Sequence, residues 1–311
     1  MFSCYKRLKM AKWYSSLKLI KSPLPPSQEY DEPWRPMEWR VSKENMLKTL
    51  NNFQPGNSEV KTFKILLYGS VGVGKSSYIN SVTSSVQGRI CNRVPSNSVL
   101  AGESFTLECK TYKLKKGTLD DDFYPFTFTD ISGIEAMPGG IQTDDIVKIL
   151  RGHINDDYTF NPVKSISEDD PKYNRYPTLK DKIHCLVSVL PANNISMMED
   201  DVIKKMKEVR TNAKNLGIPE AIIMTKVDEA CPLVKENLEK VYTSKKIKEK
   251  MEMCCNRLGV PVSYIFPVKN YHEERTTNSA VDTLILDALQ NIVNYANDYV
   301  QDQAGNESLP T

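Results

Sequence analysis

From residue 61 onward, short apolar runs alternate with longer stretches in which apolar residues recur at helical spacing. Each short run has the length and composition of a buried strand. The predicted strands cover residues 63–68, 105–113, 126–129, 183–190, 221–224 and 262–266. Because strands that alternate with helices form a sheet covered on both faces, the pattern predicts an α/β fold with a mostly parallel, six-stranded sheet.

Helices are predicted between these strands and after the last one. Three of them cover residues 75–82, 144–150 and 200–216. Thr143 is expected to cap the second of these, and Gly217 to end the third. Ser244 is expected to cap a further helix that stops at Gly259. The last helix is predicted from an apolar stripe, which we expect to be a packing surface: Leu284, Ile285, Leu289, Ile292 and Val293.

The predicted organisation has three parts. Residues 1–60 are expected to hold a basic tail, a Pro-rich linker and a docking segment, and residues 61–300 to form the globular domain. Within that domain, residues 152–182 form a polar insertion, and loops of this length are usually mobile or functional. Residues 301–311 are predicted to be a flexible tail.

The N-terminal part has an unusual charge pattern. Residues 1–21 carry six basic residues and no acid, interleaved with aromatic and apolar ones. A helix lying on anionic lipid is one interpretation, but the apolar and basic positions do not separate on a helix, which favours a flexible basic tail. Further along, Trp34 and Trp39 are expected to dock on the domain that follows.

Composition narrows the class of protein. Forty-one Lys and Arg residues against thirty-nine Asp and Glu residues give a net charge of +2, so no overall field favours nucleic acid or membrane as a partner. The chain lacks both the ~20-residue apolar span of a membrane helix and the apolar core of a signal peptide, which predicts a cytoplasmic location. Its seven cysteines form no CxxC pair, so reduced thiols are expected.

A complete GxxxxGK[ST] motif follows the first predicted strand and precedes a helix. In such a P-loop the backbone N–H groups and the helix N-terminus bind phosphate. We expect Lys75 to reach the β and γ phosphates and Ser76 to ligate Mg²⁺. A chance glycine-rich turn is the alternative, but the flanking strand and helix argue against it. The predicted phosphate-binding residues are Gly69, Ser70, Val71, Gly72, Val73, Gly74, Lys75, Ser76 and Ser77.

A DxxG sequence ends the predicted strand at 126–129. Asp130 is placed to hold Mg²⁺ through a water molecule, and the Gly133 N–H to contact a γ phosphate. This motif is weak alone but gains weight from its position after the P-loop.

The sequence Thr225-Lys226-Val227-Asp228 follows the strand predicted at 221–224 and selects the base. Guanine presents two adjacent donors, N1–H and the N2 amino group, which a carboxylate accepts as a pair. Adenine presents an acceptor at N1. The Asp228 carboxylate is therefore predicted to bind guanine, with Thr225 beside it and the Lys226 stem along the base plane. An ATP-using P-loop enzyme remains the rival interpretation.

A further contact to guanine is expected from the segment after the strand at 262–266. Val268 and Lys269 occupy the right place, although their residue types are not diagnostic.

Two features of a fast GTPase are missing. The segment at 84–104 contains no threonine that could close over Mg²⁺, which leaves Ser96, Ser98 and Thr106 as candidates without an assignment. After Gly133 the chain has Ile134, which cannot orient a water molecule as a glutamine does in Ras-like enzymes.

Hydrolysis of GTP to GDP and phosphate, if the chain performs it, is therefore expected to be slow, and the catalytic residues stay unassigned. Val71 points the same way by crowding the γ-phosphate region. Glu135, Arg89, Arg93 or a second molecule would have to compensate.

Four segments together resemble one known family. They are the Pro-Trp-Arg run at 33–35, the P-loop with its following helix at 69–80, the strand end at 129–133 and the segment at 266–271. As a set they resemble the interferon-induced protein 44 and 44-like family, over about residues 30–300. The resemblance implies a cytoplasmic, interferon-induced protein of antiviral defence and growth restraint that carries a GTP site. Longer members have a TLDc domain ahead of the G domain, and this chain is expected to be a short form without it.

These observations leave three hypotheses for a P-loop NTPase G domain that binds GTP or GDP with Mg²⁺. The first is a slow switch or assembly protein whose surface changes at residues 92–104 and 131–142. The second is a GTPase that activates itself on forming a homodimer or oligomer. The third is an interaction scaffold that the nucleotide merely stabilises. Protein partners are expected, but the sequence does not identify them.

Overall fold

The computed structural model describes residues 27–39, 42–95, 108–117, 122–136 and 140–307. A sheet of seven strands runs through the centre, in the order β4-β2-β3-β1-β5-β6-β7. Five neighbouring strands, from β3 to β7, are parallel, while β2 and β4 continue the sheet antiparallel at one edge. The strands are β1 (Phe63–Tyr68), β2 (Glu108–Lys115), β3 (Phe123–Asp130), β4 (Tyr158–Thr159), β5 (Cys185–Pro191), β6 (Glu220–Thr225) and β7 (Ile265–Pro267).

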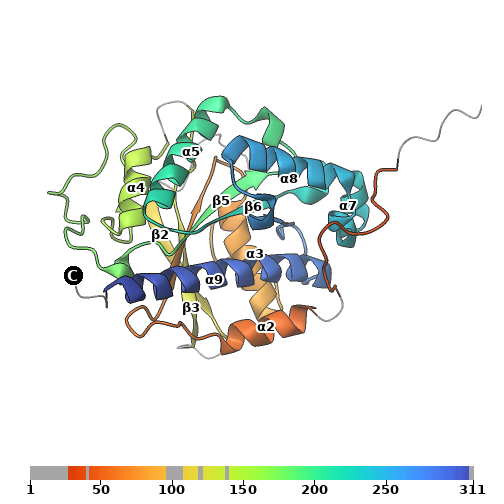
Figure 1. Ribbon diagram of the computed structural model, residues 1–311, viewed down its shortest axis with the longest axis horizontal. Coiled ribbons are helices and arrows are strands. Elements are labelled where there is room, and N and C mark those ends of the chain that lie inside the picture. The colour runs from red at the N-terminus through yellow and green to blue at the C-terminus, as the bar shows by residue number, and fades with distance from the viewer. Residues whose placement is uncertain (1–26, 40–41, 96–107, 118–121, 137–139, 308–311) are drawn as a thin grey trace, which may run out of the picture.

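Helices cover both faces of the sheet (Figure 1). α2, α3 and α9 pack together on one face, and α4, α5 and α8 pack on the other. The short helices α6 and α7 follow β6. The helices are α2 (Ser42–Asn52), α3 (Lys75–Gln87), α4 (Thr143–Arg151), α5 (Asp200–Asn215), α6 (Val227–Ala230), α7 (Pro232–Glu236), α8 (Lys245–Leu258) and α9 (Ser279–Glu307).

The central strands are buried along most of their length because helices lie on both sides of them. Every residue of β5 is buried, and its sequence CLVSVLP has no polar alternation. α9 crosses the sheet and packs against β1, β5, β6 and β7. This strand order, with a P-loop after β1, confirms the predicted P-loop G-domain fold.

Three predicted details differ from the structure. The described residues form seven strands instead of six, because the insertion at 152–182 adds β4, which pairs with Glu108 and Cys109. The last strand starts at Ile265, and the preceding Val262–Tyr264 is a 3-10 turn. α9 continues to Glu307, past the end at residue 300 that the sequence suggested.

The helix ends follow local chemistry. The Ser244 hydroxyl accepts a hydrogen bond from the Ile247 N–H, and Gly259 ends α8 with φ +76°, both as predicted. Thr143, in contrast, is the first residue of α4 and not its cap. Gln142 takes the cap position there without a side-chain cap hydrogen bond, and its amide group donates instead to the Pro162 carbonyl oxygen.

The segment before α2 lies against the last part of the domain. Trp34 packs edge-on against Tyr242, with ring centroids 5.2 Å apart. Arg35 donates hydrogen bonds to the carbonyl oxygens of Ile265 and Val262, at 2.8 and 2.6 Å. Trp39 is half-buried against the core. The basic segment 1–21 lies outside the described residues.

Candidate nucleotide-binding site

The P-loop joins β1 to α3 and needs its glycines. Gly69 has φ +153°, and a Cβ placed on it would lie 2.4 Å from the Val189 carbonyl oxygen. Gly74 has φ +97° and precedes α3 without a side-chain cap. The first N–H groups of α3 therefore have no side-chain acceptor, which is the arrangement in which a helix N-terminus binds an anion.

Lys75 is buried, with 9% of its surface exposed. Its Nζ donates to the carbonyl oxygens of Gly69 and Ser70, at 3.2 and 3.1 Å. Burial lowers the pKa of this ammonium, while the nearby Asp130 raises it. Since no carboxylate pairs with Lys75 directly among the described residues, a phosphate would supply the missing counter-charge.

Ser76 and Asp130 meet beneath the P-loop. The Ser76 hydroxyl donates to Oδ2 of Asp130 at 2.6 Å. Oδ1 of Asp130 is buried and has no hydrogen-bond partner in the described part of the chain. Burial raises the pKa of the carboxyl group against the opposing effect of Lys75. A hydroxyl beside a carboxylate with a spare oxygen suits a hard divalent cation, so these two residues fit Mg²⁺.

Thr225, at the end of β6, ties the predicted base-selecting motif to the P-loop. Its hydroxyl donates to the Val73 carbonyl oxygen at 2.7 Å. The next residue, Lys226, has φ +59°, a conformation that is uncommon outside glycine and frequent at functional sites. Asp228 is half-buried in α6, and no hydrogen bond or ion pair joins its carboxylate to another described residue. The motif is thus placed beside the P-loop with its acid unengaged.

The segment after β7 contains the other residues that were predicted to contact the base. The Val268 N–H donates to the Met224 carbonyl oxygen at 2.8 Å, so it is not available to a base. This hydrogen bond excludes the Val268 N–H as a donor to the base, so the backbone of Lys269 remains the candidate for that contact. Asn270, which the sequence did not single out, donates from Nδ2 to the Gly74 carbonyl oxygen at 3.1 Å, and its buried Oδ1 has no partner in the described structure.

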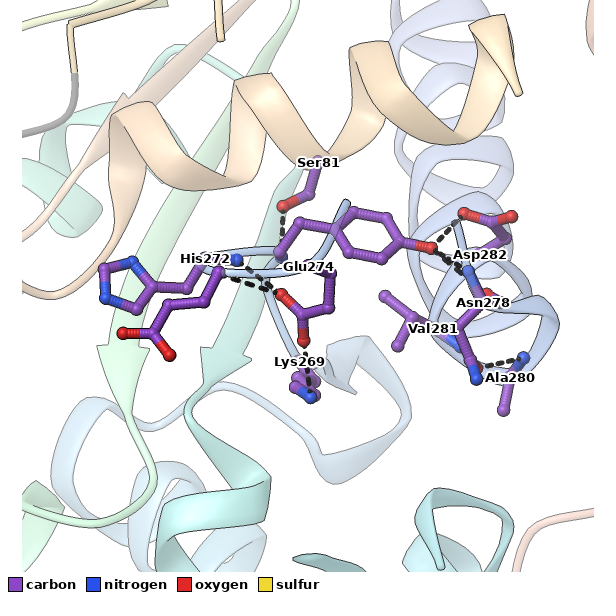
Figure 2. A network of polar contacts seen from close by, with 10 residues as sticks. Ser81, Lys269, His272, Glu274, Asn278, Ala280, Val281 and Asp282 are labelled. Atoms are coloured by element: carbon purple, nitrogen blue, oxygen red, sulfur yellow. Dashed lines mark hydrogen bonds and ion pairs between the residues drawn. The ribbon is translucent and has the colours of Figure 1, made fainter. Parts of the chain in front are cut away.

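A polar network behind this segment fixes its position (Figure 2). The Tyr271 N–H donates to the Ser81 hydroxyl of α3 at 2.9 Å. The Tyr271 hydroxyl donates to Oδ1 of Asp282 at 2.7 Å. Asp282 is fully buried on α9, accepts from Ser85 at 2.7 Å and pairs with Lys43 of α2 at 2.6 Å. Three helices therefore hold the segment that follows β7.

The DxxG segment lies against the P-loop. A Cβ on Gly133 would lie 2.4 Å from Cγ2 of Val71 and 2.6 Å from its nitrogen. The Ile134 N–H donates to the Gly69 carbonyl oxygen at 3.0 Å. Lys205 of α5 then holds the next turn by donating to the Glu135 carbonyl oxygen at 2.6 Å. The two segments thus pack directly against each other.

A pocket of about 560 Å³ opens beside them. It is lined by Ser70, Val71, Gly72, Val73, Ile134, Glu135, Ala136, Pro191, Asn193, Asn194, Met197, Met198, Glu199, Val202 and Lys226.

Most of the other residues considered for Mg²⁺ binding or hydrolysis lie away from the P-loop or outside the described residues. Arg89 follows the last turn of α3, about 20 Å along the helix from the P-loop. The backbone N–H of Arg93 donates to Asn80, in the middle of α3. Ser96, Ser98 and Thr106 lie outside the described residues. Of the groups considered for positioning water, Glu135 is the one that lines the pocket beside the P-loop.

Known proteins provide an independent comparison. No protein-family model matches the chain. It is 34% identical over 262 residues to human interferon-induced protein 44, 33% identical over 265 residues to the mouse protein of that name, and 31% identical over 273 residues to human interferon-induced protein 44-like. These alignments cover 84%, 84% and 88% of this chain. The chain spans only 58%, 61% and 60% of the relatives' own lengths.

Solved structures give weaker likenesses. Toc33 from Arabidopsis thaliana, crystallised in complex with GDP and Mg²⁺, is 13% identical with a TM-score of 0.45, over 84% of this chain and 97% of that one. Translation elongation factor SelB from Methanococcus maripaludis is 13% identical with a TM-score of 0.36, over 76% of this chain and 34% of that one. The fold assignment rests instead on the chain's own strand order and P-loop. The sequence identities, over 84–88% of the chain, support its resemblance to the interferon-induced protein 44 and 44-like family.

Proposed function

We propose that this chain binds GTP and GDP with Mg²⁺ and acts as a slow switch or assembly protein of the interferon-induced immune response in the cytoplasm. The names of its relatives and the family resemblance support the interferon-induced and antiviral context. In this proposal Lys75 and the P-loop bind the phosphates, Ser76 and Asp130 hold Mg²⁺, and Asp228 selects guanine.

The observation that carries the proposal is the pair of buried charges at the phosphate end. Oδ1 of Asp130 has no partner among the described residues, and Lys75 is held by carbonyl oxygens alone. Leaving buried polar groups without partners is costly, so a Mg²⁺–phosphate group would stabilise the arrangement. Mg²⁺ would neutralise the negative charge of the phosphates there.

The geometry around Ile134 supports slow turnover. Its side chain is only 2% exposed and is apolar, so it neither donates to nor accepts from an attacking water. A γ phosphate would have to fit where Gly133 now lies against Val71. The nucleotide state would then change the position of the DxxG segment, which is how GTP would alter the surface.

Size-exclusion chromatography with light scattering tests the switch. The protein saturated with a non-hydrolysable GTP analogue should elute at a different mass or shape from the protein saturated with GDP. Identical profiles, together with identical proteolysis patterns around residues 131–142, would reject a switch while leaving nucleotide binding intact.

A second candidate function is a GTPase that becomes active when two copies meet over the nucleotide. One observation favours it: Met197 is 77% exposed and Val71 38% exposed, and both border the pocket beside the P-loop. Apolar side chains at such a rim suit a protein partner. Phosphate release per molecule should then rise with protein concentration, whereas a constant specific activity would remove this candidate.

The third candidate, a scaffold whose nucleotide is static, makes a different prediction for Lys75→Ala. In a scaffold, Lys75→Ala would reduce cellular function only by reducing the stability of the protein. A variant with unchanged melting temperature and lost function would exclude it.

A further inference from the structure

A second cavity lies at the opposite end of the sheet from the P-loop. Its volume is about 350 Å³, within the range of small-molecule sites. The P-loop and the base-selecting motif follow the carboxyl ends of β1 and β6, whereas this cavity lies where β5 and β6 begin. The cavity is lined by Leu150, Arg151, His153, Pro177, Lys182, Leu216, Ile218, Tyr299 and Gln303.

The charged lining of this cavity is cationic. Arg151 and Lys182 contribute a guanidinium and an ammonium group, and neither forms an ion pair with another described residue. No acidic residue is among the lining residues. The neighbouring Asp181 turns its carboxylate into a local cap, where it accepts from the Thr178 N–H and hydroxyl at 2.8 and 2.7 Å. The two cations therefore have no ion-pair partner in the part of the chain that is described, and Asp144 on the same helix acts on Arg151 only from a longer distance.

His153 is held in one orientation at the same cavity. Its Nδ1 lies 2.9 Å from the Asn174 carbonyl oxygen, and its ring stacks on Tyr173 with centroids 5.1 Å apart. Because a carbonyl oxygen only accepts, Nδ1 carries the hydrogen of this bond. The Nε2 atom is left without a partner in the described residues, and the adjoining segment fixes the ring.

Apart from Gln303, the rest of the wall is apolar. Leu150, Ile218 and Tyr299 are almost completely buried, with exposed fractions of 0%, 4% and 6%. They come from α4, the turn before β6 and α9, three parts of the domain that the core holds together. An inorganic anion would contact only the cations. A larger ligand would also remove water from this apolar wall.

We propose that this cavity binds a small anion that carries an apolar or aromatic group, such as an aryl phosphate or an aryl carboxylate. Arg151, Lys182 and His153 would bind the anionic head, since guanidinium and ammonium groups make strong charge-assisted hydrogen bonds to such oxygens. The apolar body would lie against Leu150, Ile218 and Tyr299. The site is separate from the nucleotide site and does not depend on the function proposed above.

Calorimetric titration with phenyl phosphate tests the site. Binding should weaken about tenfold or more in Arg151→Ala/Lys182→Ala, because each lost charged contact costs a large part of that factor. Lys246→Ala, which removes an exposed lysine of α8, is the matched control and should bind normally. Lys75→Ala controls for binding of phenyl phosphate at the P-loop. This variant should also bind phenyl phosphate normally.

Two further probes define the ligand class. Inorganic phosphate and benzyl alcohol should each bind at least about tenfold more weakly than phenyl phosphate, because each offers half of the contacts. The proposal is overturned if phenyl phosphate does not bind, if the Arg151→Ala/Lys182→Ala protein binds it normally, or if Lys75→Ala abolishes binding. Equal affinity for inorganic phosphate would also overturn it, since the apolar wall would then contribute nothing.

Discussion

The phosphate end and the base end of the candidate nucleotide site differ in how their polar groups are satisfied. At the phosphate end, Lys75 donates only to backbone carbonyl oxygens and Asp130 keeps an unpartnered oxygen. Behind the base end, Tyr271 is bound to both Ser81 and Asp282, and Lys269 pairs with Glu274 at 2.8 Å. The phosphate end is therefore incomplete without a ligand, whereas the network behind the base end is largely complete within the described residues. At the base itself, the Asp228 carboxylate and Oδ1 of Asn270 have no partner in the described part of the chain.

This difference indicates which end of the site supplies binding energy for a nucleotide and which end fixes the geometry of the site. An incomplete buried site gains most from a ligand, because unpaired buried groups are costly in the free protein. A complete network gains little from a ligand but fixes the geometry that a base must match. We therefore expect substitutions at the phosphate end to change affinity, and substitutions behind the base end to change stability.

The largest effect is expected from Lys75→Ala. It removes the buried ammonium of the P-loop, and the affinity for GDP with Mg²⁺ should fall about a hundredfold or more. The unfolding free energy of the free protein should change by only about 1 kcal/mol, since just two hydrogen bonds to carbonyl oxygens are lost. Calorimetry and thermal unfolding would measure both, with Lys246→Ala as the control. An unchanged affinity would contradict the role given to the phosphate end.

Asp130→Asn should separate the effect of the carboxylate's negative charge from the effect of its shape, because the amide has nearly the same shape and no charge. Burial raises the pKa of Asp130 above its value in the unfolded chain, so the free protein loses stability as the pH rises through the folded-state pKa. The variant removes this loss: its unfolding free energy should not fall in that window, and above it should exceed that of the unmodified protein.

The same variant should bind GDP with little help from Mg²⁺, whereas the unmodified protein should gain about tenfold in affinity from the metal. Denaturant unfolding between pH 4 and pH 8 and titrations with and without Mg²⁺ would measure these effects. A variant that is less stable at every pH and still gains affinity from Mg²⁺ would show that Asp130 serves structure only.

The smallest effect on binding is expected from Tyr271→Phe. Losing the hydroxyl leaves Asp282 with one hydrogen bond fewer and should lower the unfolding free energy by about 1–3 kcal/mol. GDP affinity should change less than about threefold, since the tyrosine hydroxyl lies behind the segment that would face the base. Tyr176→Phe is the matched control, because Tyr176 is 86% exposed and should not affect stability. A large affinity loss without a stability loss would reverse the contrast between the two ends.

The parts of this molecule that the sequence could predict are those in which function and local structure depend on neighbouring residues. The P-loop from Gly69 to Ser76 carries its strand, turn and helix in one stretch, and Ser244 and Gly259 mark the limits of α8 through their own conformations. The sequence assigns Ser76 and Asp130 to one Mg²⁺ site, and the structure brings them within hydrogen-bond distance, because the end of β3 lies beside the end of β1 in a parallel sheet.

What the sequence could not predict depends on contacts between distant residues. Asn270 binds the Gly74 carbonyl oxygen from 196 positions away, and Ser85 binds Asp282 from 197 positions away. Neither residue type indicates such a role alone. β4 was missed because two residues within a polar insertion carry no periodic signal, and they form a strand only where the edge of β2 is available. The engagement of the Val268 N–H likewise follows from its register with β6, which a single sequence does not give.

The central claim, that this is a guanine-nucleotide site, is tested most directly by titrating the purified chain with GDP and ATP in Mg²⁺, beside Asp228→Asn. We predict that GDP binds at least about a hundredfold more tightly than ATP, since a site built around paired hydrogen bonds rejects a base that lacks them. Asp228→Asn should weaken GDP binding about tenfold or more, because an amide replaces one of the two acceptors. Equal binding of ATP and GDP, or a variant that binds GDP normally, would contradict the claim.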